Sequence, residues 1–221
     1  MATNTDPAGP WSLVVPLKPL ARAKSRLARA AGEDARPRLA LAFAQDTVAA
    51  ALACSRVRDV VVVTDDAVAA AALSVLGARI VPDVPGAGLN AALAHGARSV
   101  RALRPAAAVA ALNADLPALR TGELARVLDF ASAFPNAFLR DAAGIGTTFL
   151  AAASSAEFRP AFGGPSGARH LASGAVEIAL SGVDSVRRDV DTGEDLRVAL
   201  ALGVGSHTAR IATVPAPSRD R

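Results

Sequence analysis

The segment Asp59–Thr64 reads DVVVVT, a nearly unbroken run of β-branched residues. Such a run is typical of a strand covered on both faces, because a half-exposed strand would alternate apolar with polar residues. Three further apolar segments of strand length alternate with longer stretches of helical periodicity, and these segments are Ser12–Leu17, Ala78–Pro82 and Ala106–Leu112. The alternation predicts an α/β fold with a mostly parallel sheet, right-handed crossovers and helices on both faces.

Four helices are expected in the first part of the chain: Pro37–Cys54, Asp66–Leu76, Leu89–Leu103 and a helix from Thr121, taken as its cap, to about Ala133. Later, Phe138–Leu139 and Thr147–Ala152 are expected to pair as a hairpin across a glycine turn. A short helix through His170 follows. The last helix is expected to begin after a cap at Thr192 and to end at Leu202.

The composition is that of a soluble chain, expected in the cytoplasm. Hydrophobic residues make up 52% of the 221 residues and the mean hydropathy is +0.32, which is enough for one well-filled domain. No apolar stretch has the ~18 residues of a membrane span, and the polar N-terminus does not resemble a signal peptide. Cys54 is the only cysteine, which excludes an intramolecular disulfide. We expect one domain over residues 11–205, between tails at 1–10 and 206–221.

The charge balance favours an anionic partner. The formal charge is +4 and the sequence pI is about 10.4. Aromatic residues make up only 4% and tyrosine is absent, so no stacking platform for nucleic acid is expected and we predict no nucleic-acid partner. The sequence contains no P-loop, no dinucleotide fingerprint after the first strand, no HExxH and no GxSxG. Nucleotides and phosphorylated metabolites are therefore the expected ligands.

A cationic loop follows the first strand and carries Lys18, Arg22, Lys24 and Arg26. Ligands of such sheets collect at the carboxyl ends of the strands, where this loop begins. It lacks the glycines that usually surround phosphates, so side chains are expected to hold the negative charge. We favour Lys24 and Arg26, which lie nearest the following helix. The alternative is that each is a solvated surface charge.

Carboxylates are expected at the same edge. Asp115 follows an apolar strand directly, and Asp189 and Asp191 lie two residues apart, so on an extended segment they point the same way. Mg²⁺ prefers a few carboxylates together with substrate phosphates. Two separated aspartates and a cationic loop therefore fit a site for a nucleoside triphosphate with Mg²⁺. Alternatively, Asp115 caps a helix or turn and Asp191 merely starts the last helix.

Six phrases occur in order from Val14 to about Gly205: VVPLKPLARAKSRLA, GLNAAL, LNADLPAL, D-x-x-G-x-GTT (Asp141–Thr148), FGGPS-x-x-x-H (Phe162–His170) and DVDTGEDL. In these phrases the chain resembles the 2-phospho-L-lactate and phosphoenolpyruvate guanylyltransferases (CofC/FbiD) of coenzyme F-420 biosynthesis. The resemblance implies a single-domain nucleotidyltransferase fold of the glycosyltransferase-A type. It also implies transfer of GMP from GTP to a three-carbon phosphate, phosphoenolpyruvate or 2-phospho-L-lactate, with release of pyrophosphate.

The same resemblance implies roles for individual residues. The acceptor would be bound by Thr148, Gly163 and Ser166. The metal would be held by Asp115 and by Asp191, which we favour over Asp189 because related enzymes place this ligand just before the cap of the final helix. Nucleotide contacts are expected from Lys18, Lys24, Arg26 and Asn90, with Lys24 and Arg26 also catalytic, although the GLN phrase that contains Asn90 could equally be a helix start.

Several alternatives stay open. The Ala- and Arg-rich composition is similar to that of actinobacterial proteins, for which phosphoenolpyruvate is the expected acceptor. Another enzyme of this fold could instead use CTP or UTP with a different acceptor. A non-catalytic domain that binds phosphometabolites is the second alternative. The sequence also leaves open whether two copies form a homodimer.

Overall fold

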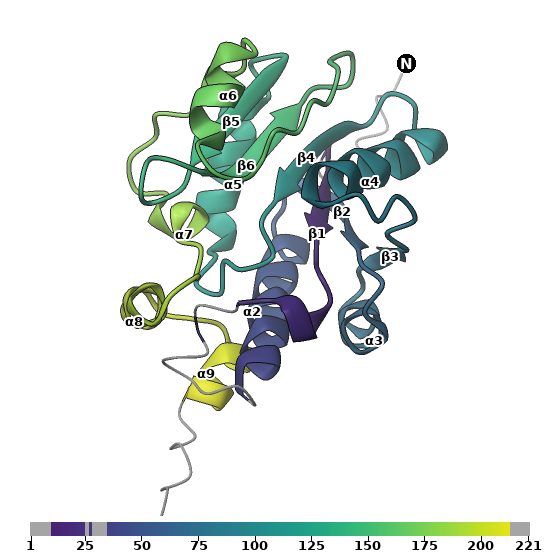
Figure 1. Cartoon of the computed structure of the whole chain (residues 1–221). Coiled ribbons are helices and arrows are strands. Elements are labelled where there is room, and N and C mark those ends of the chain that lie inside the picture. The colour runs from purple at the N-terminus through teal and green to yellow at the C-terminus, as the bar shows by residue number, and fades with distance from the viewer. Residues whose placement is uncertain (1–9, 25–26, 28–34, 213–221) are drawn as a thin grey trace, which may run out of the picture.

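A seven-stranded sheet forms the centre of the molecule (Figure 1). The computed structural model describes residues 10–24, 27 and 35–212. The strands are β1 (Trp11–Pro16), β2 (Val57–Val63), β3 (Arg79–Val81), β4 (Ala108–Leu112), β5 (Asn136–Arg140), β6 (Thr147–Ala152) and β7 (Val176–Glu177). Their order is β3-β2-β1-β4-β6-β5-β7, and only β6 runs antiparallel to its neighbours, β4 and β5. The predicted α/β fold with a mostly parallel sheet is confirmed.

Helices cover both faces of this sheet. They are η1 (Leu20–Arg22), α2 (Ala35–Leu52), α3 (Ala67–Val75), α4 (Leu89–Leu103), α5 (Thr121–Ala131), α6 (Ser166–Ala172), α7 (Asp184–Arg187), α8 (Gly193–Leu202) and α9 (Ser206–Ala212). Helices α2 and α5 pack on one face, and α4 and α6 on the other (Figure 1). The sheet therefore has the two covered faces that the DVVVVT run predicts.

The alternation of side chains along β1 shows how the two cores are built. Leu13 and Val15 pack with residues of α2 and α5, whereas Val14 points the other way, toward α4. A Cβ added at Gly96 of α4 would lie 2.5 Å from Val14 Cγ1. Glycine at this position lets α4 approach the sheet closely at β1 and β2.

A β-bulge interrupts the β5–β6 hairpin. Leu139 is paired with Phe149 but Arg140 with Thr147, so Thr148 is the extra residue of β6. One extra residue reverses the alternation of side chains beyond it. As a result, the Thr147 hydroxyl faces α6, whereas the Thr148 hydroxyl faces α7.

The end of the chain differs from the sequence-based expectation. In place of a loosely held tail from residue 206, Ser206–Ala212 form α9, which packs against α2. Thr121 is not a cap, because the N-cap position is Arg120 and its side chain makes no capping hydrogen bond. The predicted cap at Thr192 is present and forms a reciprocal capping box with Asp195. In the described part of the chain, no helix is both long and apolar enough to cross a membrane.

Asp46 of α2 attaches α9, and its removal should destabilise the fold. Its side chain is only 6% exposed, and it accepts the backbone N–H groups of His207 (3.0 Å) and Thr208 (2.8 Å). Asp46→Ala leaves these donors unpaired, so we expect the free energy of unfolding to fall by about 2–3 kcal/mol. Urea denaturation measures the change. Asp129→Ala is the control, since Asp129 makes a surface ion pair worth about 0–1 kcal/mol. An Asp46→Ala effect no larger than the control would contradict this role.

Candidate active site

The segments after β4 and after α7 lie side by side at the carboxyl edge of the sheet. The backbone N–H of Asn113 donates to Thr148 O at 3.0 Å, which joins the end of β4 to β6. The N–H of Val190 donates to Asp115 O at 3.1 Å. These two contacts place Asp115 beside the DVD segment, 189–191. Strand order, rather than proximity in sequence, therefore brings the predicted carboxylates together.

Lys24 lies between two of these carboxylates. Its Nζ donates to Asp191 Oδ1 at 2.6 Å and also to Asp115 Oδ2. The Lys24 side chain is only 11% exposed, and burial alone would lower its pKa. The carboxylates of Asp115 and Asp191 outweigh burial and raise the pKa of Lys24 above its ordinary value. The ammonium is therefore charged and neutralises the pair.

The backbone around Lys24 is held in an unusual conformation. Lys24 has φ +55°, a left-handed value that is uncommon for a residue other than glycine. The loop is attached on both sides, because Leu20 N–H donates to Asp66 Oδ2 at 2.8 Å and Arg36 Nη1 donates to Ala23 O at 2.5 Å. Strained backbone of this kind persists only where its surroundings hold it, and it is frequent at functional sites.

One oxygen of Asp115 has no hydrogen-bond partner among the described residues. Its Oδ2 accepts from Lys24, but Oδ1 is buried and makes no hydrogen bond in the described part of the chain. A buried carboxylate oxygen without a partner is costly unless a ligand completes it. Oxygen ligands of this type suit Mg²⁺. Asp115 and Asp191 therefore fit a divalent cation, and Lys24 stands where a positive charge is needed.

Asp189 differs from its neighbour Asp191. Burial, followed by the negative charges of Asp115, Asp191 and Asp141, raises the pKa of Asp189 to about 7, while Lys24 opposes the shift. Lys24 contacts Asp191 and not Asp189, in line with the preference for Asp191 as the metal ligand. No set of three or more His, Cys, Asp or Glu side chains in the described residues is arranged to hold a metal without other ligands.

The predicted acceptor residues do not share one set of contacts. Gly163 lies in an exposed loop with φ +97°, whereas Thr148 and Ser166 are buried. Thr148 Oγ1 donates to Val186 O at 2.7 Å, and Ser166 Oγ lies 3.1 Å from Thr147 Oγ1. The bulge in β6 explains this division. The roles of these three residues in acceptor binding stay predictions.

Asn90 and Lys18 lie in different surroundings. The Asn90 side chain accepts from Phe162 N at 2.8 Å and donates to Phe162 O at 3.1 Å, which ties the start of α4 to the FGGPS loop. The GLN phrase is indeed a helix start, since α4 begins at Leu89. Lys18 is exposed and makes no ion pair with any described residue. Arg26 lies outside the described residues.

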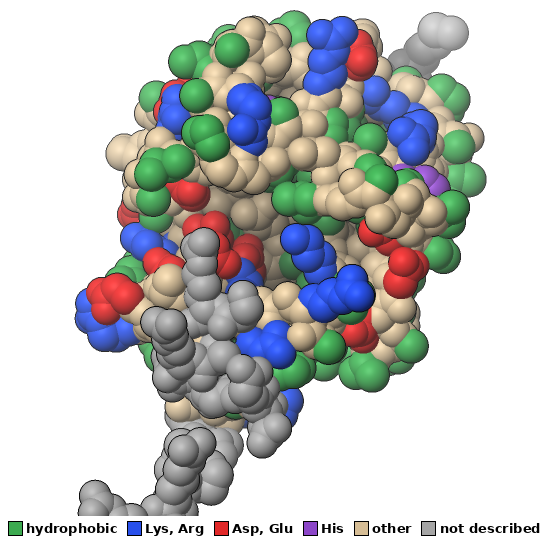
Figure 2. Space-filling model, viewed as in Figure 1, with side chains coloured by type: hydrophobic (Ala, Val, Ile, Leu, Met, Phe, Trp, Pro, Cys, Tyr) green, Lys and Arg blue, Asp and Glu red, His purple; other side chains and the backbone are tan. Residues whose placement is uncertain are grey.

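A hollow opens on the face that carries this site. Figure 2 shows acidic side chains on one wall of the hollow and Lys and Arg side chains along the opposite rim. Such an arrangement suits a ligand that carries both phosphates and a bound cation.

The comparisons with known proteins agree with this geometry. The family model "Guanylyl transferase CofC like" matches residues 11–211. The chain belongs to this family. The resemblance seen in the sequence is therefore confirmed, and with it the assignment of the chain as a nucleotidyltransferase.

Two relatives of this CofC-like chain are named phosphoenolpyruvate guanylyltransferase. The protein from Streptomyces avermitilis is 68% identical over 214 residues, 96% of this chain and 99% of the relative. The protein from Streptomyces coelicolor is 69% identical over 202 residues, 91% of this chain and 95% of the relative. Among solved structures, a protein from Desulfovibrio desulfuricans G20 described as a nucleotide-diphospho-sugar transferase has a TM-score of 0.70. It is 14% identical, with 92% of this chain and 94% of that chain covered, and supports the fold alone.

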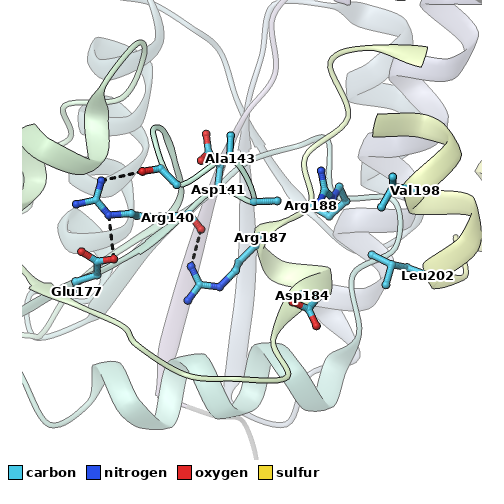
Figure 3. Close-up of a pocket in the computed structure, with 11 residues that line it drawn as sticks. Arg140, Asp141, Ala143, Glu177, Asp184, Arg187, Arg188, Val198 and Leu202 are labelled. Atoms are coloured by element: carbon cyan, nitrogen blue, oxygen red, sulfur yellow. Dashed lines mark hydrogen bonds and ion pairs between the residues drawn. The ribbon is translucent and has the colours of Figure 1, made fainter. Parts of the chain in front are cut away.

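The CofC-like chain also has a cavity that the sequence analysis did not predict (Figure 3). It has a volume of about 540 Å³ and lies between the hairpin turn, α7 and α8. Two of the arginines that line the cavity already have partners within the protein. Arg140 pairs with Glu177 at 2.9 Å, and Arg187 donates to Arg140 O at 3.1 Å (Figure 3). None of Lys24, Asp115 and Asp191 lines it. The cavity is therefore separate from the candidate site formed by Lys24, Asp115 and Asp191.

Sequence reasoning missed Thr147 and His170. Thr147 Oγ1 lies 3.0 Å from His170 Nδ1 and 3.1 Å from Ser166 Oγ. The available signal was the histidine at the end of FGGPS-x-x-x-H, which had no assigned task. Thr147 could not be chosen over Thr148 because the bulge is not visible in the sequence.

Proposed function

We propose that this chain transfers GMP from GTP to phosphoenolpyruvate and releases pyrophosphate, as a step of coenzyme F-420 biosynthesis, with Mg²⁺ as its cofactor. The observation that carries the proposal is Lys24, held between Asp115 and Asp191, beside a buried Asp115 oxygen that makes no hydrogen bond to any described residue. This arrangement supplies two carboxylates for a cation and one ammonium for phosphates. Relatives about 68% identical and named for this activity support the choice of GTP and phosphoenolpyruvate. 2-Phospho-L-lactate is the alternative acceptor.

The proposed chemistry is balanced without a general base. A phosphate oxygen of the acceptor bonds to the α-phosphorus of GTP as the bond from that phosphorus to the bridging oxygen of pyrophosphate breaks. The acceptor phosphate is already ionised at pH 7, so no proton must be removed. Positioning and charge neutralisation are what the protein must supply. Asp115 and Asp191 would hold Mg²⁺, which, when bound, neutralises phosphate charge and stabilises the leaving group.

The basic residues of the first loop have separate tasks in this proposal. Lys24 leaves the carboxylates and donates to the triphosphate, where the charge of the departing pyrophosphate develops. Lys18, exposed on the same loop, is free to meet the β- and γ-phosphates, and Arg26 is assigned to the same group. Asn90 is proposed to contact the nucleotide. It also holds the FGGPS loop by its hydrogen bonds to the backbone of Phe162. The hydroxyls and amide of Thr148, Ser166 and Gly163 are assigned to the acceptor.

A matrix of substrates tests the proposal. Pyrophosphate release is measured with GTP, CTP, UTP or ATP against phosphoenolpyruvate, 2-phospho-L-lactate or 3-phosphoglycerate. The proposal expects GTP with phosphoenolpyruvate to give the highest kcat/KM. Equal or better turnover with CTP or UTP would indicate the alternative nucleotidyltransferase. Metabolite binding without pyrophosphate under any condition would indicate a non-catalytic binder.

Ser166→Ala should weaken acceptor binding. A hydroxyl that donates to a charged phosphate or carboxylate contributes to the binding free energy of the acceptor. Its loss should therefore raise the KM for phosphoenolpyruvate about tenfold. The KM for GTP should stay within about threefold of the wild type, since the nucleotide is assigned to other residues. Steady-state kinetics measure both. Ser74→Ala, at an exposed position of α3, is the matched control. An unchanged acceptor KM would remove Ser166 from the site.

Location and assembly are proposed on chemical grounds. GTP and phosphoenolpyruvate are cytoplasmic metabolites, so we assign the enzyme to the cytoplasm. A homodimer stays a prediction, and sedimentation velocity at micromolar concentration would test it.

A further inference from the structure

His170 of α6 has no task in the proposed chemistry, yet it is completely buried and its ring contacts Phe162 of the FGGPS loop. Its ring lies against Phe138 (centroids 5.7 Å apart) and edge-on to Phe162 (5.2 Å). Burial, and secondarily the charge of Arg169, lowers the pKa of His170 to about 4. The imidazole is therefore neutral at pH 7 and carries one ring hydrogen.

The position of that hydrogen follows from the contacts. The backbone N–H of Ala161 donates to His170 Nε2 at 3.0 Å, so Nε2 carries no hydrogen. The neutral ring must then be protonated at Nδ1. Thr147 Oγ1 lies 3.0 Å from Nδ1 and accepts from it. The Thr147 hydroxyl therefore cannot donate to His170, and its own hydrogen must point to another acceptor.

The same reasoning extends to Ser166. Its Oγ lies 3.1 Å from Thr147 Oγ1, and either hydroxyl of such a pair can donate. In either direction one of the two buried hydroxyl hydrogens has no acceptor among the described residues, which is costly unless a ligand supplies one. Because the Nδ1 hydrogen prevents Thr147 from donating to His170, an anion bound at Ser166 pairs both hydrogens only when Thr147 donates to Ser166 and Ser166 donates to the anion.

We propose that His170 is a positioning residue, which acts through Thr147 to keep the Ser166 hydroxyl as a hydrogen-bond donor for the anionic acceptor. This inference rests on the proposed function, because the acceptor is the anion that Ser166 meets. With the acceptor bound, the hydrogen bonds run in one direction, from Ala161 N–H through His170 and Thr147 to Ser166. A hydroxyl locked as a donor favours a phosphate or carboxylate, which only accept, over a neutral ligand.

Neighbouring side chains hold this series of hydrogen bonds in place. The Asn90 amide binds both backbone groups of Phe162, the ring that lies edge-on to His170. The Arg169 side chain donates to Ala161 O at 3.0 Å, next to the N–H that fixes the tautomer. The bulge in β6 turns Thr147 toward His170. Three separate elements thus fix the ring and its two partners.

Kinetics of matched variants test this series of hydrogen bonds from Ala161 to Ser166, here called the relay. His170→Leu and Thr147→Val should raise the KM for phosphoenolpyruvate about tenfold and leave kcat and the KM for GTP within about threefold. His170→Asn, whose amide nitrogen can replace Nδ1, and Thr147→Ser should keep the acceptor KM near the wild-type value. On a Ser166→Ala background, His170→Leu should raise it no further. His95→Leu, a partly exposed histidine of α4, is the control.

Two kinetic outcomes would overturn the relay. One is an unchanged acceptor KM in Thr147→Val, which retains the histidine and the packing even if His170→Leu fails to fold. The other is an additive effect of His170→Leu on the Ser166→Ala background. ¹⁵N NMR of the imidazole supplies a readout independent of turnover. Protonated Nδ1 is expected, and protonated Nε2 would contradict the proposed series of hydrogen bonds. Failure of the proposed function is distinguishable, because then the wild-type protein itself shows no turnover with phosphoenolpyruvate.

Discussion

Lys24→Met should lower kcat by ~10³-fold and, at the same time, make the nucleotide-free protein bind a divalent cation more tightly. The first effect follows because a positioned cation contributes ~10³–10⁵-fold to phosphoryl transfer. The second follows because Lys24 occupies the space between Asp115 and Asp191. Without the ammonium, two carboxylates repel each other and attract any cation that can replace it. We expect the dissociation constant for the divalent cation to fall about tenfold, which corresponds to ~1.4 kcal/mol.

Titration of Mn²⁺ into the nucleotide-free protein, followed by electron paramagnetic resonance, measures this effect. Lys18→Met is the matched control, because Lys18 lies on the same loop but is exposed. It should leave Mn²⁺ affinity unchanged and raise the KM for GTP. Unchanged or weaker Mn²⁺ binding in Lys24→Met would show that the ammonium does not take the place of a metal.

Asp115→Asn should lower pyrophosphate release by ~10³-fold while the fold is kept. Asparagine has nearly the same shape but lacks the negative charge that a cation and Lys24 require. Lys24 would still pair with Asp191, so the melting temperature should change by only a few degrees. Activity assays and differential scanning calorimetry measure the two effects. Asp129→Asn, at a surface ion pair, is the control. Activity within threefold of the wild type would exclude Asp115 from the reaction.

The sheet could be predicted because its strands are strongly patterned. Apolar runs such as Val60–Val63 are completely buried, and burial on both faces leaves a clear record in residue type. The segments that were missed are short and polar, and tertiary contacts hold them. Helix α9 owes its attachment to the Asp46 carboxylate, 160 or more positions away in the chain. No local pattern could indicate that contact.

The site was predictable to a similar extent. Asp115 and the loop after β1 could be placed at one edge because the carboxyl ends of parallel strands meet there. Lys24, which contacts both carboxylates, has a left-handed backbone that the residue type does not suggest. Thr147 was overlooked because a one-residue bulge decides which threonine faces Ser166.

The fate of labelled oxygen tests the central claim most directly. The protein is incubated with unlabelled GTP and with phosphoenolpyruvate that carries ¹⁸O in its phosphoryl oxygens. The masses of the products are then measured by mass spectrometry. We predict a guanosine product that contains the whole labelled phosphoenolpyruvate joined through the α-phosphorus, together with unlabelled pyrophosphate. Labelled pyrophosphate, or release of GMP without the joined product, would contradict guanylyl transfer to the acceptor phosphate.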